Sequence, residues 1–330
     1  MQVSPFPERV ASLPKAELHV HLEGSIRPAI ASALAARHGV KLTEEEVRRR
    51  YAYTDFAGFL DAFKWVTSFV RGPGDFALIA EDLAEQLIEQ KVVYAEVTLS
   101  VGVMFLRQQQ PEANFAAIVA ATEPFEKRGL RLNWIFDAVR QFGAEAAMRV
   151  VQAARRCASR RIVAFGIGGD ELSLPAGEFR GVYERAEEYG FHRLIHAGEI
   201  GGPEKIREAI EILGVERIGH GIAAIRDVAL MEELAERRIP LEICPESNLR
   251  TGALGVQLGK SAAAMEEHPL AEIVRRGVAV TLATDDPAMF HTSLEEEYRN
   301  AWGTGLTEEE LADVVENGFR FAFGEVGRSL

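Results

Sequence analysis

The sequence predicts an α/β fold, a (β/α)8 barrel of the TIM type that takes in residues 1–330 as a single domain. Two observations predict this fold. Short runs rich in β-branched residues alternate with helical stretches almost throughout the chain, and there are eight such runs. In addition, no Pro/Gly/Ser-rich linker, low-complexity tract or strong internal repeat divides the 330 residues, and barrels commonly reach this length as one unit. A doubly wound open sheet is the alternative architecture.

The eight runs are the expected strands of the barrel. They span residues 17–21, 92–99, 132–139, 162–167, 193–196, 217–220, 241–244 and 278–284. In a barrel of this kind, catalytic residues lie at the C-terminal ends of the strands and in the loops that follow them. A functional site is therefore expected where these runs end.

The helices between the strands have clear boundary signals. Pro203 opens one helix and Gly214 follows its last turn, with apolar residues recurring between them at the 3.6-residue period. Thr43, Ser293 and Thr307 each precede a glutamate by three residues, the pattern of a capping box. These signals place helices between and after the expected strands.

Residues 24–72 form a segment that is long for a single crossover. We expect extra helices in it, after the first strand and near the barrel mouth. The segment contains the apolar run DFAGFLDAFKWV. Its residues Phe56, Phe59 and Phe63 are interpreted either as an ordinary buried helix face or as a wall of the binding pocket.

Charge and cysteine content exclude several classes of protein. Lys+Arg 37 against Asp+Glu 50 gives a net charge of −13, which opposes a broad nucleic-acid or anionic-membrane surface. Cys157 and Cys244 are too few and too far apart for a disulfide framework or a thiolate zinc cluster. The chain shows neither a signal-peptide pattern nor the roughly 18 uncharged residues of a membrane span. We expect a soluble cytoplasmic protein without nucleic-acid or membrane partners, and the sequence carries no signal for an oligomeric state.

Histidines at strand ends are the main functional signal. His19 and His21 lie two residues apart on the first strand, so both side chains point to the same side, into the barrel. His196 ends another strand, and Asp285 follows the last one. Zinc accepts imidazole nitrogen and carboxylate oxygen, and a catalytic zinc site keeps one position for water. The alternatives are hydrogen-bonded core histidines and, for Asp285, a helix N-cap.

Five motifs, HVHLEGS, HAGE, GHG, CPESN and TDDP, occur in this order and together resemble the adenosine deaminase family of the amidohydrolase superfamily. The resemblance covers residues 14–323. It implies a (β/α)8 barrel with one zinc ion per chain. It also implies hydrolytic removal of the 6-amino group from a purine nucleoside or a related aminopurine.

The resemblance implies a role for each matching residue. Glu199 of HAGE would donate a proton to purine N1, His220 of GHG would orient and stabilise the attacking hydroxide, and Asp286 would meet N7. Protonation matters because C6 of adenine is a weak electrophile, so the ring needs a proton as the hydroxide adds. The metal ligands implied by the resemblance are His19, His21, His196 and Asp285.

The segment GIGGDE is similar to the glycine segment of the family that contacts substrate, which assigns the backbone N–H of Gly169 to purine N3. Glu23 and the three phenylalanines are expected on the sugar side of the pocket. The substrate-binding residues expected in total are His21, Glu23, Phe56, Phe59, Phe63, Gly169 and Asp286.

Three positions depart from the patterns seen in the family, and two of them concern the substrate. Glu23 stands where many members have an aspartate that meets the ribose 5′-hydroxyl, and glutamate is common there among relatives acting on adenine or 5′-modified adenosines. Gly166 stands where an aspartate is usual. Gly219-His220-Gly221 differs from the Asp-His-Gly of adenine-specific relatives, which favours a nucleoside. We therefore expect adenosine or a 5′-modified form such as 6-aminodeoxyfutalosine.

Other functions are weighed against this one. An adenine deaminase and a non-catalytic metal-binding relative are the alternatives, and retention of Glu199, His220 and Asp286 argues against the second. A two-metal hydrolase usually takes a bridging lysine on the fourth strand, and residues 162–167 contain none. The cytidine-deaminase type is excluded because Cys244-Pro245 lacks the P-C-x-x-C pattern.

Overall fold

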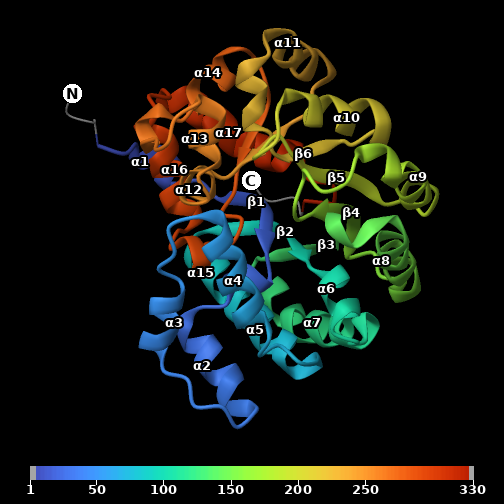
Figure 1. Ribbon diagram of the computed structural model, residues 1–330. Helices are drawn as coiled ribbons and strands as arrows, with labels where there is room; N and C mark the ends of the chain where they lie inside the picture. The colour runs from blue at the N-terminus through green and yellow to red at the C-terminus, as the bar shows by residue number, and fades with distance from the viewer. Residues whose placement is uncertain (1–4, 327–330) are drawn as a thin grey trace.

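Eight parallel strands pair in sequence order in the computed structural model, which describes residues 5–326 (Figure 1). No strand boundary differs from the predicted one by more than two residues. The strands are β1 (Lys15–His21), β2 (Val92–Leu99), β3 (Arg131–Val139), β4 (Ile162–Gly168), β5 (His192–Ala197), β6 (Arg217–His220), β7 (Leu241–Ile243) and β8 (Val280–Leu282).

The two edges of this sheet meet at one backbone bridge, between Val20 of β1 and Asp285. The N–H of His21 donates to the carbonyl of Asp285 at 2.7 Å, and the N–H of Asp285 donates to the carbonyl of His19 at 3.0 Å. These bonds bring the first and last strands together. The barrel prediction is confirmed, and the doubly wound alternative is wrong.

Helices surround the strands and connect them (Figure 1). The α-helices are α1 (Glu8–Ser12), α2 (Pro28–Arg37), α3 (Glu44–Arg50), α4 (Phe56–Thr67), α5 (Pro73–Glu89), α6 (Val101–Leu106), α7 (Pro111–Glu126), α8 (Gly143–Cys157), α9 (Arg180–Glu188), α10 (Pro203–Leu213), α11 (Val228–Arg237), α12 (Pro245–Arg250), α13 (Ala253–Leu258), α14 (Leu270–Arg275), α15 (Pro287–Phe290), α16 (Leu294–Gly303) and α17 (Glu308–Arg320). Short 3-10 turns are η1 (Glu23–Ser25), η2 (Arg140–Phe142), η3 (Ala176–Phe179), η4 (Ile222–Arg226) and η5 (Met265–Glu267).

The predicted helix boundaries have local causes. Thr43 and Thr307 each form a complete capping box, in which a glutamate three residues on also bonds the backbone of the capping residue. Ser293 accepts the N–H of Glu296. Gly214 ends α10 in the left-handed conformation, with φ 60°, which glycine adopts without steric cost.

The extra helices after the first strand are confirmed as α2, α3 and α4, ahead of α5. Figure 1 shows α2 and α3 at the edge of the molecule and α4 nearer the strands. Phe56, Phe59 and Phe63 of α4 line a cavity at the barrel mouth. Phe59 also stacks on Phe290, with the ring centroids 5.0 Å apart. The α4 face is therefore both part of the apolar packing and a wall of the cavity.

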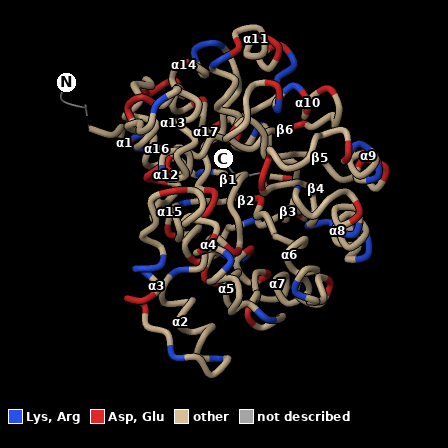
Figure 2. The backbone as a smooth tube through the Cα atoms, viewed as in Figure 1, with Lys and Arg blue, Asp and Glu red and all other residues tan. Residues whose placement is uncertain are grey.

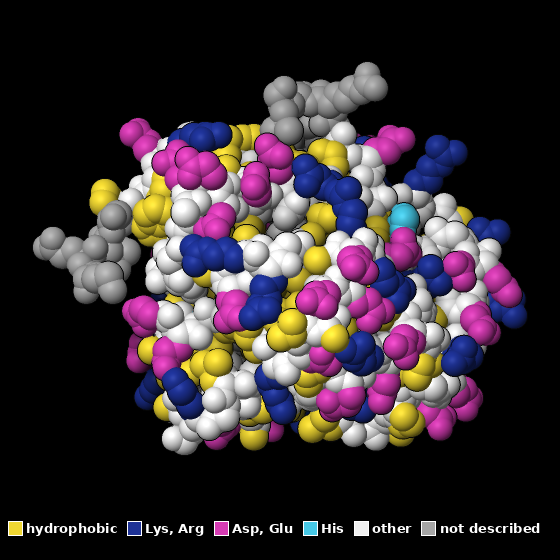
Figure 3. Space-filling view, turned by 90° about the horizontal axis from the view of Figure 1, so that it is seen from above, with side chains coloured by type: hydrophobic (Ala, Val, Ile, Leu, Met, Phe, Trp, Pro, Cys, Tyr) yellow, Lys and Arg dark blue, Asp and Glu magenta, His cyan; other side chains and the backbone are white. Residues whose placement is uncertain are grey.

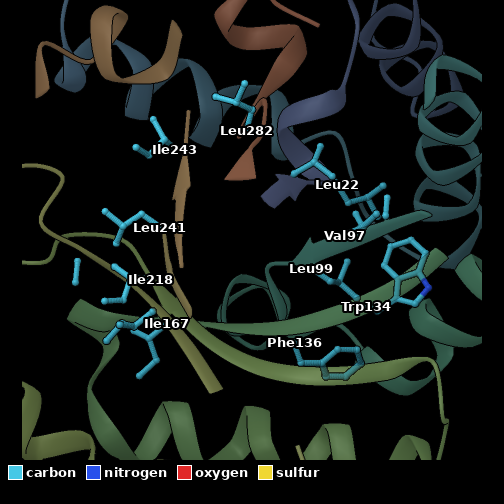
Figure 4. Close-up of a cluster of buried hydrophobic side chains, with 14 of the residues drawn as sticks. Leu22, Val97, Leu99, Trp134, Phe136, Ile167, Ile218, Leu241, Ile243 and Leu282 are labelled. Carbon is cyan, nitrogen blue, oxygen red and sulfur yellow. The ribbon is translucent and has the colours of Figure 1, made fainter. Parts of the chain in front are cut away.

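The main apolar core lies between the strands and the helices that surround them, and Figure 4 shows side chains from successive strands that contribute to it. Trp134 and Phe136 of β3 pack on Phe115 of α7, with ring centroids 6.1 and 5.2 Å apart. Because side chains alternate along a strand, one face of each strand packs on the helices and the other faces the barrel interior. Polar residues can therefore gather inside the barrel.

A buried charge network occupies part of that interior. Arg217 of β6 lies 2.7 Å from Glu96 of β2 and 2.5 Å from Glu242 of β7, and all three side chains are at most 1% exposed. The segment after α17 covers this network. Arg217 donates to the carbonyl of Phe321 at 2.9 Å, and its guanidinium lies 3.7 Å from the ring centroid of Phe323.

The molecular surface carries charges of both signs. Basic and acidic residues intersperse along the outer helices (Figure 2), and the face in Figure 3 likewise mixes both signs. Within residues 5–326, the structure contains no helix with the length and apolar character needed to cross a bilayer. Because its charges are mixed, the face in Figure 3 has no large positively charged patch of the kind that binds a polyanion.

Replacing Arg217 with Met tests the buried network. The change leaves Glu96 and Glu242 without their cation, and removing one partner of a buried ion pair costs about 3–5 kcal/mol. We expect the free energy of unfolding, measured in urea, to fall by about this amount. Arg276→Met is the control, because Arg276 pairs with Glu272 on the surface. Equal stability of the two variants would contradict this account of the network.

Candidate active site

The candidate site residues lie together at the C-terminal ends of the strands. His19 and His21 end β1, with ring centroids 5.3 Å apart, so the i, i+2 spacing places both rings on one side of the strand. His196 is the penultimate residue of β5 and His220 ends β6. Asp285 and Asp286 follow β8. The parallel barrel brings these ends to one place.

Four side chains lie close enough together to hold one metal ion, and a fifth adjoins them. Ligand atoms of His19, His196, His220 and Asp285 all lie within 4.8 Å of one another. His21 belongs to the same cluster, because its Nε2 is 3.3 Å from Nε2 of His196 and 3.3 Å from Oδ1 of Asp285. The close group therefore contains three of the four predicted ligands together with His220, and the fourth, His21, adjoins it through His196 and Asp285.

A chain of hydrogen bonds fixes the proton on His220. The N–H of Leu270 donates to Nδ1 of His268, so that ring carries its proton on Nε2, which donates to Oδ1 of Asn248 at 3.3 Å. The amide NH2 of Asn248 therefore faces Nδ1 of His220, at 3.0 Å. A neutral His220 consequently holds its proton on Nε2, 3.7 Å from Oε2 of Glu199.

Two further contacts support residues of the cluster, and the sequence analysis predicted neither of them. Oε2 of Glu242 lies 2.8 Å from Nδ1 of His19, leaving Nε2 of that ring free to face the cluster. The hydroxyl of Ser247 donates to Oδ2 of Asp285 at 2.7 Å. Ser247 and Asn248 are in the CPESN motif, so this motif is the signal in the sequence that marks them. Glu242 has no sequence signal beyond being an acid in an apolar strand.

Burial sets the protonation of most of these groups. It lowers the pKa of His21 and of His220 to about 4, so both rings are neutral at pH 7. Burial also acts on His19, but the carboxylates of Asp285 and Glu242 outweigh it and raise the pKa to about 10, so this ring is protonated at pH 7 when no metal is bound. Burial, with the charge of Asp285, raises the pKa of Glu199 to about 8.

The two acids after β8 differ in charge although they are adjacent. Burial opposes ionisation of Asp285, but the neighbouring histidines, His19 first, hold its pKa well below the usual value. Burial and the charge of Asp285 raise the pKa of Asp286 well above its usual value. One carboxylate is therefore available as a ligand, and the other keeps a proton to donate.

The cluster fits a divalent metal. Nε2 of His19 is buried and has no hydrogen-bond partner, although it lies 3.4 Å from Oδ1 of Asp285. A buried nitrogen without a partner is costly unless it binds something. A metal bound at Nε2 of His19 would replace the proton that the two neighbouring carboxylates hold there, and imidazole nitrogens with one carboxylate are a donor set that transition metals prefer. His220 and Asp285 are also non-glycine residues with positive φ, 62° and 61°, and such conformations cluster at functional sites.

A cavity of about 450 Å³ opens above the cluster. Gly169, Glu199, His220 and Asp286 line it, as do the three phenylalanines of α4. The sequence analysis did not identify the other polar lining residues, which come from helix α4, strand β3, the turn η2 and the ends of other elements, and only the closed barrel brings them together. They are Lys64, Thr67, Ser100, Arg107, Asp137, Gln141 and Thr251.

Glu23 lies behind this lining rather than in it. It is 3% exposed and accepts the N–H of Ser100, a lining residue, at 3.1 Å. The contact of Glu23 with sugar remains a prediction.

The structure explains why position 166 is a glycine. It pairs with Asp137 in the β3–β4 register, and a Cβ at position 166 would lie only 3.0 Å from Oδ1 of Asp137. The glycine makes room for a carboxyl group from the neighbouring strand. Burial raises the pKa of Asp137 to about 8. A cavity-lining acid is therefore present at this level of the barrel, but β3 supplies it.

A parallel barrel with histidine and aspartate at the C-terminal ends of β1, β5, β6 and β8 defines the class of protein, a deaminase barrel of the amidohydrolase superfamily. The adenosine deaminase family model matches residues 14–329, and the chain belongs to this family. It is therefore a hydrolase that acts on C–N bonds, as the sequence predicted.

Individual relatives point to two activities. The chain is 40% identical over 321 residues to the aminodeoxyfutalosine deaminase of Streptomyces coelicolor, covering 95% of this chain and 81% of that protein. It is 35% identical over 323 residues to an adenine deaminase of the same organism, covering 95% and 91%. The crystal structure of adenine deaminase from Arthrobacter aurescens superposes with a TM-score of 0.87 at 29% identity, covering 96% and 95%.

Glu242→Gln tests the support of His19. The amide keeps the size of the side chain but weakens the charge-assisted hydrogen bond to Nδ1. Metal affinity, measured by competition with a chelator, should fall about 10–100-fold, as is typical for partners of ligating histidines. Glu216→Gln is the control, because Glu216 makes the same contact, also 2.8 Å, with His192 outside the site. An unchanged affinity in Glu242→Gln would disprove the supporting role.

Proposed function

We propose that this protein removes the 6-amino group of a 6-aminopurine nucleoside by zinc-dependent hydrolysis, giving the 6-oxo product and ammonia. The observation that carries the proposal is the convergence of the His/Asp cluster with Glu199 beneath one cavity. The preferred substrate is adenosine or a 5′-modified adenosine such as 6-aminodeoxyfutalosine. The 40% identity to an aminodeoxyfutalosine deaminase supports the 5′-modified form.

One zinc ion per chain would be held by the two histidines of β1, the histidine of β5 and the first acid after β8. When bound, zinc would lower the pKa of a water far below its bulk value, to about 7, and so supply the nucleophile. The structural support is the free Nε2 of His19 beside an ionised carboxylate. The proposed ligands are His19, His21, His196 and Asp285.

Glu199 is the proposed proton donor to purine N1. Its raised pKa, about 8, keeps the carboxyl protonated at neutral pH, as a general acid requires. His220 holds a proton at Nε2 and can direct it to the attacking oxygen. Asp286 keeps its proton and can share it with N7. The N–H of Gly169 is proposed to bind N3, so each ring nitrogen except the glycosidic one has a partner.

The cavity supports a nucleoside over a free base. It extends from the His/Asp cluster along the phenylalanines of α4 and includes Lys64 and Arg107 in its lining. An adenine bound over the cluster would leave this apolar part unfilled, whereas a ribose with a 5′ substituent would bury against it. Adenine deamination is the second candidate, favoured by the 35% identity to an adenine deaminase.

Ammonia release tests the function. Adenosine, 2′-deoxyadenosine, adenine, 5′-methylthioadenosine and 6-aminodeoxyfutalosine should be compared with the zinc-loaded enzyme, and we expect a nucleoside to have the highest kcat/KM. Adenine as the best substrate would favour the second candidate. If none of the five compounds released ammonia, the protein would be interpreted as a non-catalytic metal-binding relative.

Metal analysis tests the proposed ligands. We expect one zinc per chain, and we expect Asp285→Ala to weaken zinc binding more than the roughly 10–100-fold typical of supporting residues. His192→Ala is the matched histidine control, because His192 begins β5 and pairs with Glu216 outside the site. Parent-like zinc affinity in Asp285→Ala would remove this residue from the ligand set.

Glu199→Gln tests proton donation. The amide keeps size and a hydrogen-bond donor but cannot supply the proton, so kcat should fall by about 10²–10⁴ with zinc retained. In the parent, activity should decline as pH rises through about 8, because the protonated acid is the active form. Single-turnover rates across pH should show that decline in the parent and not in the variant. A parent-like kcat would move the role to another residue.

A further inference from the structure

We propose that Glu171 and Gln257 clamp the loop of residues 198–201 from opposite sides and so position the Glu199 carboxyl group. Both are positioning residues, and neither was identified from sequence. The inference rests on the proposed function, because it concerns the group assigned there as the proton donor.

Glu171 holds the N–H groups of this loop. Oε2 accepts the N–H of Gly198 at 2.7 Å, while Oε1 accepts those of Ile200 and Gly201. The side chain follows β4 and is 5% exposed. A carboxylate that accepts three backbone donors makes strong charge-assisted bonds, and these bonds offset its burial.

Gln257 holds the carbonyl groups of the same loop. Its Nε2 donates to the carbonyl of Glu199 at 2.7 Å and to that of Gly201 at 2.9 Å. Arg226 donates to Oε1 of Gln257 at 3.2 Å, which fixes the amide with its NH2 group toward the loop. The loop is therefore held through its donors on one side and its acceptors on the other.

The Glu199 side chain is weakly held by comparison. Within residues 5–326, its polar contacts are a hydroxyl of Thr251 at 3.5 Å and Nε2 of His220 at 3.7 Å, both long for hydrogen bonds. The loop belongs to no helix or strand, and Gly198 has a φ of 69°. Since the side chain lacks strong partners of its own, the position of its carboxyl group depends on the backbone that Glu171 and Gln257 hold.

Glu171→Gln is the first test. It offers one acceptor oxygen instead of two and places an NH2 group against backbone N–H groups. We expect kcat for the best nucleoside to fall about 10²-fold, the effect typical of a small displacement of a catalytic group, with KM and zinc content near the parent values. Glu171→Asp, which keeps the charge but is one methylene shorter, should recover part of the lost rate.

Asp170→Asn is the matched control. It removes the same charge from the adjacent residue, which is exposed and does not contact the loop, so kcat should equal that of the parent. Gln257→Leu tests the opposite side of the clamp and should lower kcat in the same way, even where a Glu171 variant folds poorly. Parent-like kcat in both Glu171→Gln and Gln257→Leu would overturn the inference.

Hydrogen exchange separates this inference from the proposed function. Amides of residues 198–201 should exchange faster in zinc-loaded Glu171→Gln than in the parent, while amides of β4 and β6 stay protected. This measurement needs no substrate, so it tests the clamp even where no nucleoside is deaminated. Unchanged exchange in the loop would overturn the clamp, whereas faster exchange without a loss of kcat would overturn only its link to Glu199.

Discussion

The two hydrogen bonds that join β1 to the segment after β8 constrain the rest of the site. They are made by the backbone of His19, His21 and Asp285, whose side chains are three of the proposed metal ligands. These three ligands are therefore held together by barrel closure itself, because they cannot separate unless the two backbone bonds between β1 and the segment after β8 break. The left-handed backbone of Asp285 belongs to the same constraint, since it lets one residue serve both the seam and the cluster.

A second constraint is the row of buried charges that connects the site to the interior of the barrel. Glu242 contacts Nδ1 of His19 with one oxygen and pairs with Arg217 through the other. Arg217 in turn binds Glu96 and the carbonyl of Phe321 in the segment after α17. Burying charges is unfavourable unless each has a partner. The interior therefore satisfies its charges along a continuous line that ends at the proposed metal site.

The proposed chemistry depends on keeping neighbouring acids in different states. Asp285 is ionised because histidines surround it, whereas Glu199 and Asp286 keep protons because they are buried near its charge. The negative charge of Asp285 thus makes it a metal ligand, and the same charge helps to keep Glu199 and Asp286 protonated. The relatives differ in whether they are named for a nucleoside or a base, and the proposed preference for a nucleoside depends on the part of the cavity that extends from the cluster along the phenylalanines of α4.

The sequence by itself determined the strands, the helix caps and the placement of histidines at strand ends. These depend on local signals: β-branched runs, capping residues such as Thr307, and the i, i+2 spacing of His19 and His21. Only the tertiary structure decided which other residues support the histidines at the strand ends. Glu242 lies 223 residues from the histidine that it contacts, and Asp137 reaches over Gly166 from another strand. Such contacts follow from strand register and barrel closure, which bring distant segments together and leave no local pattern in the sequence.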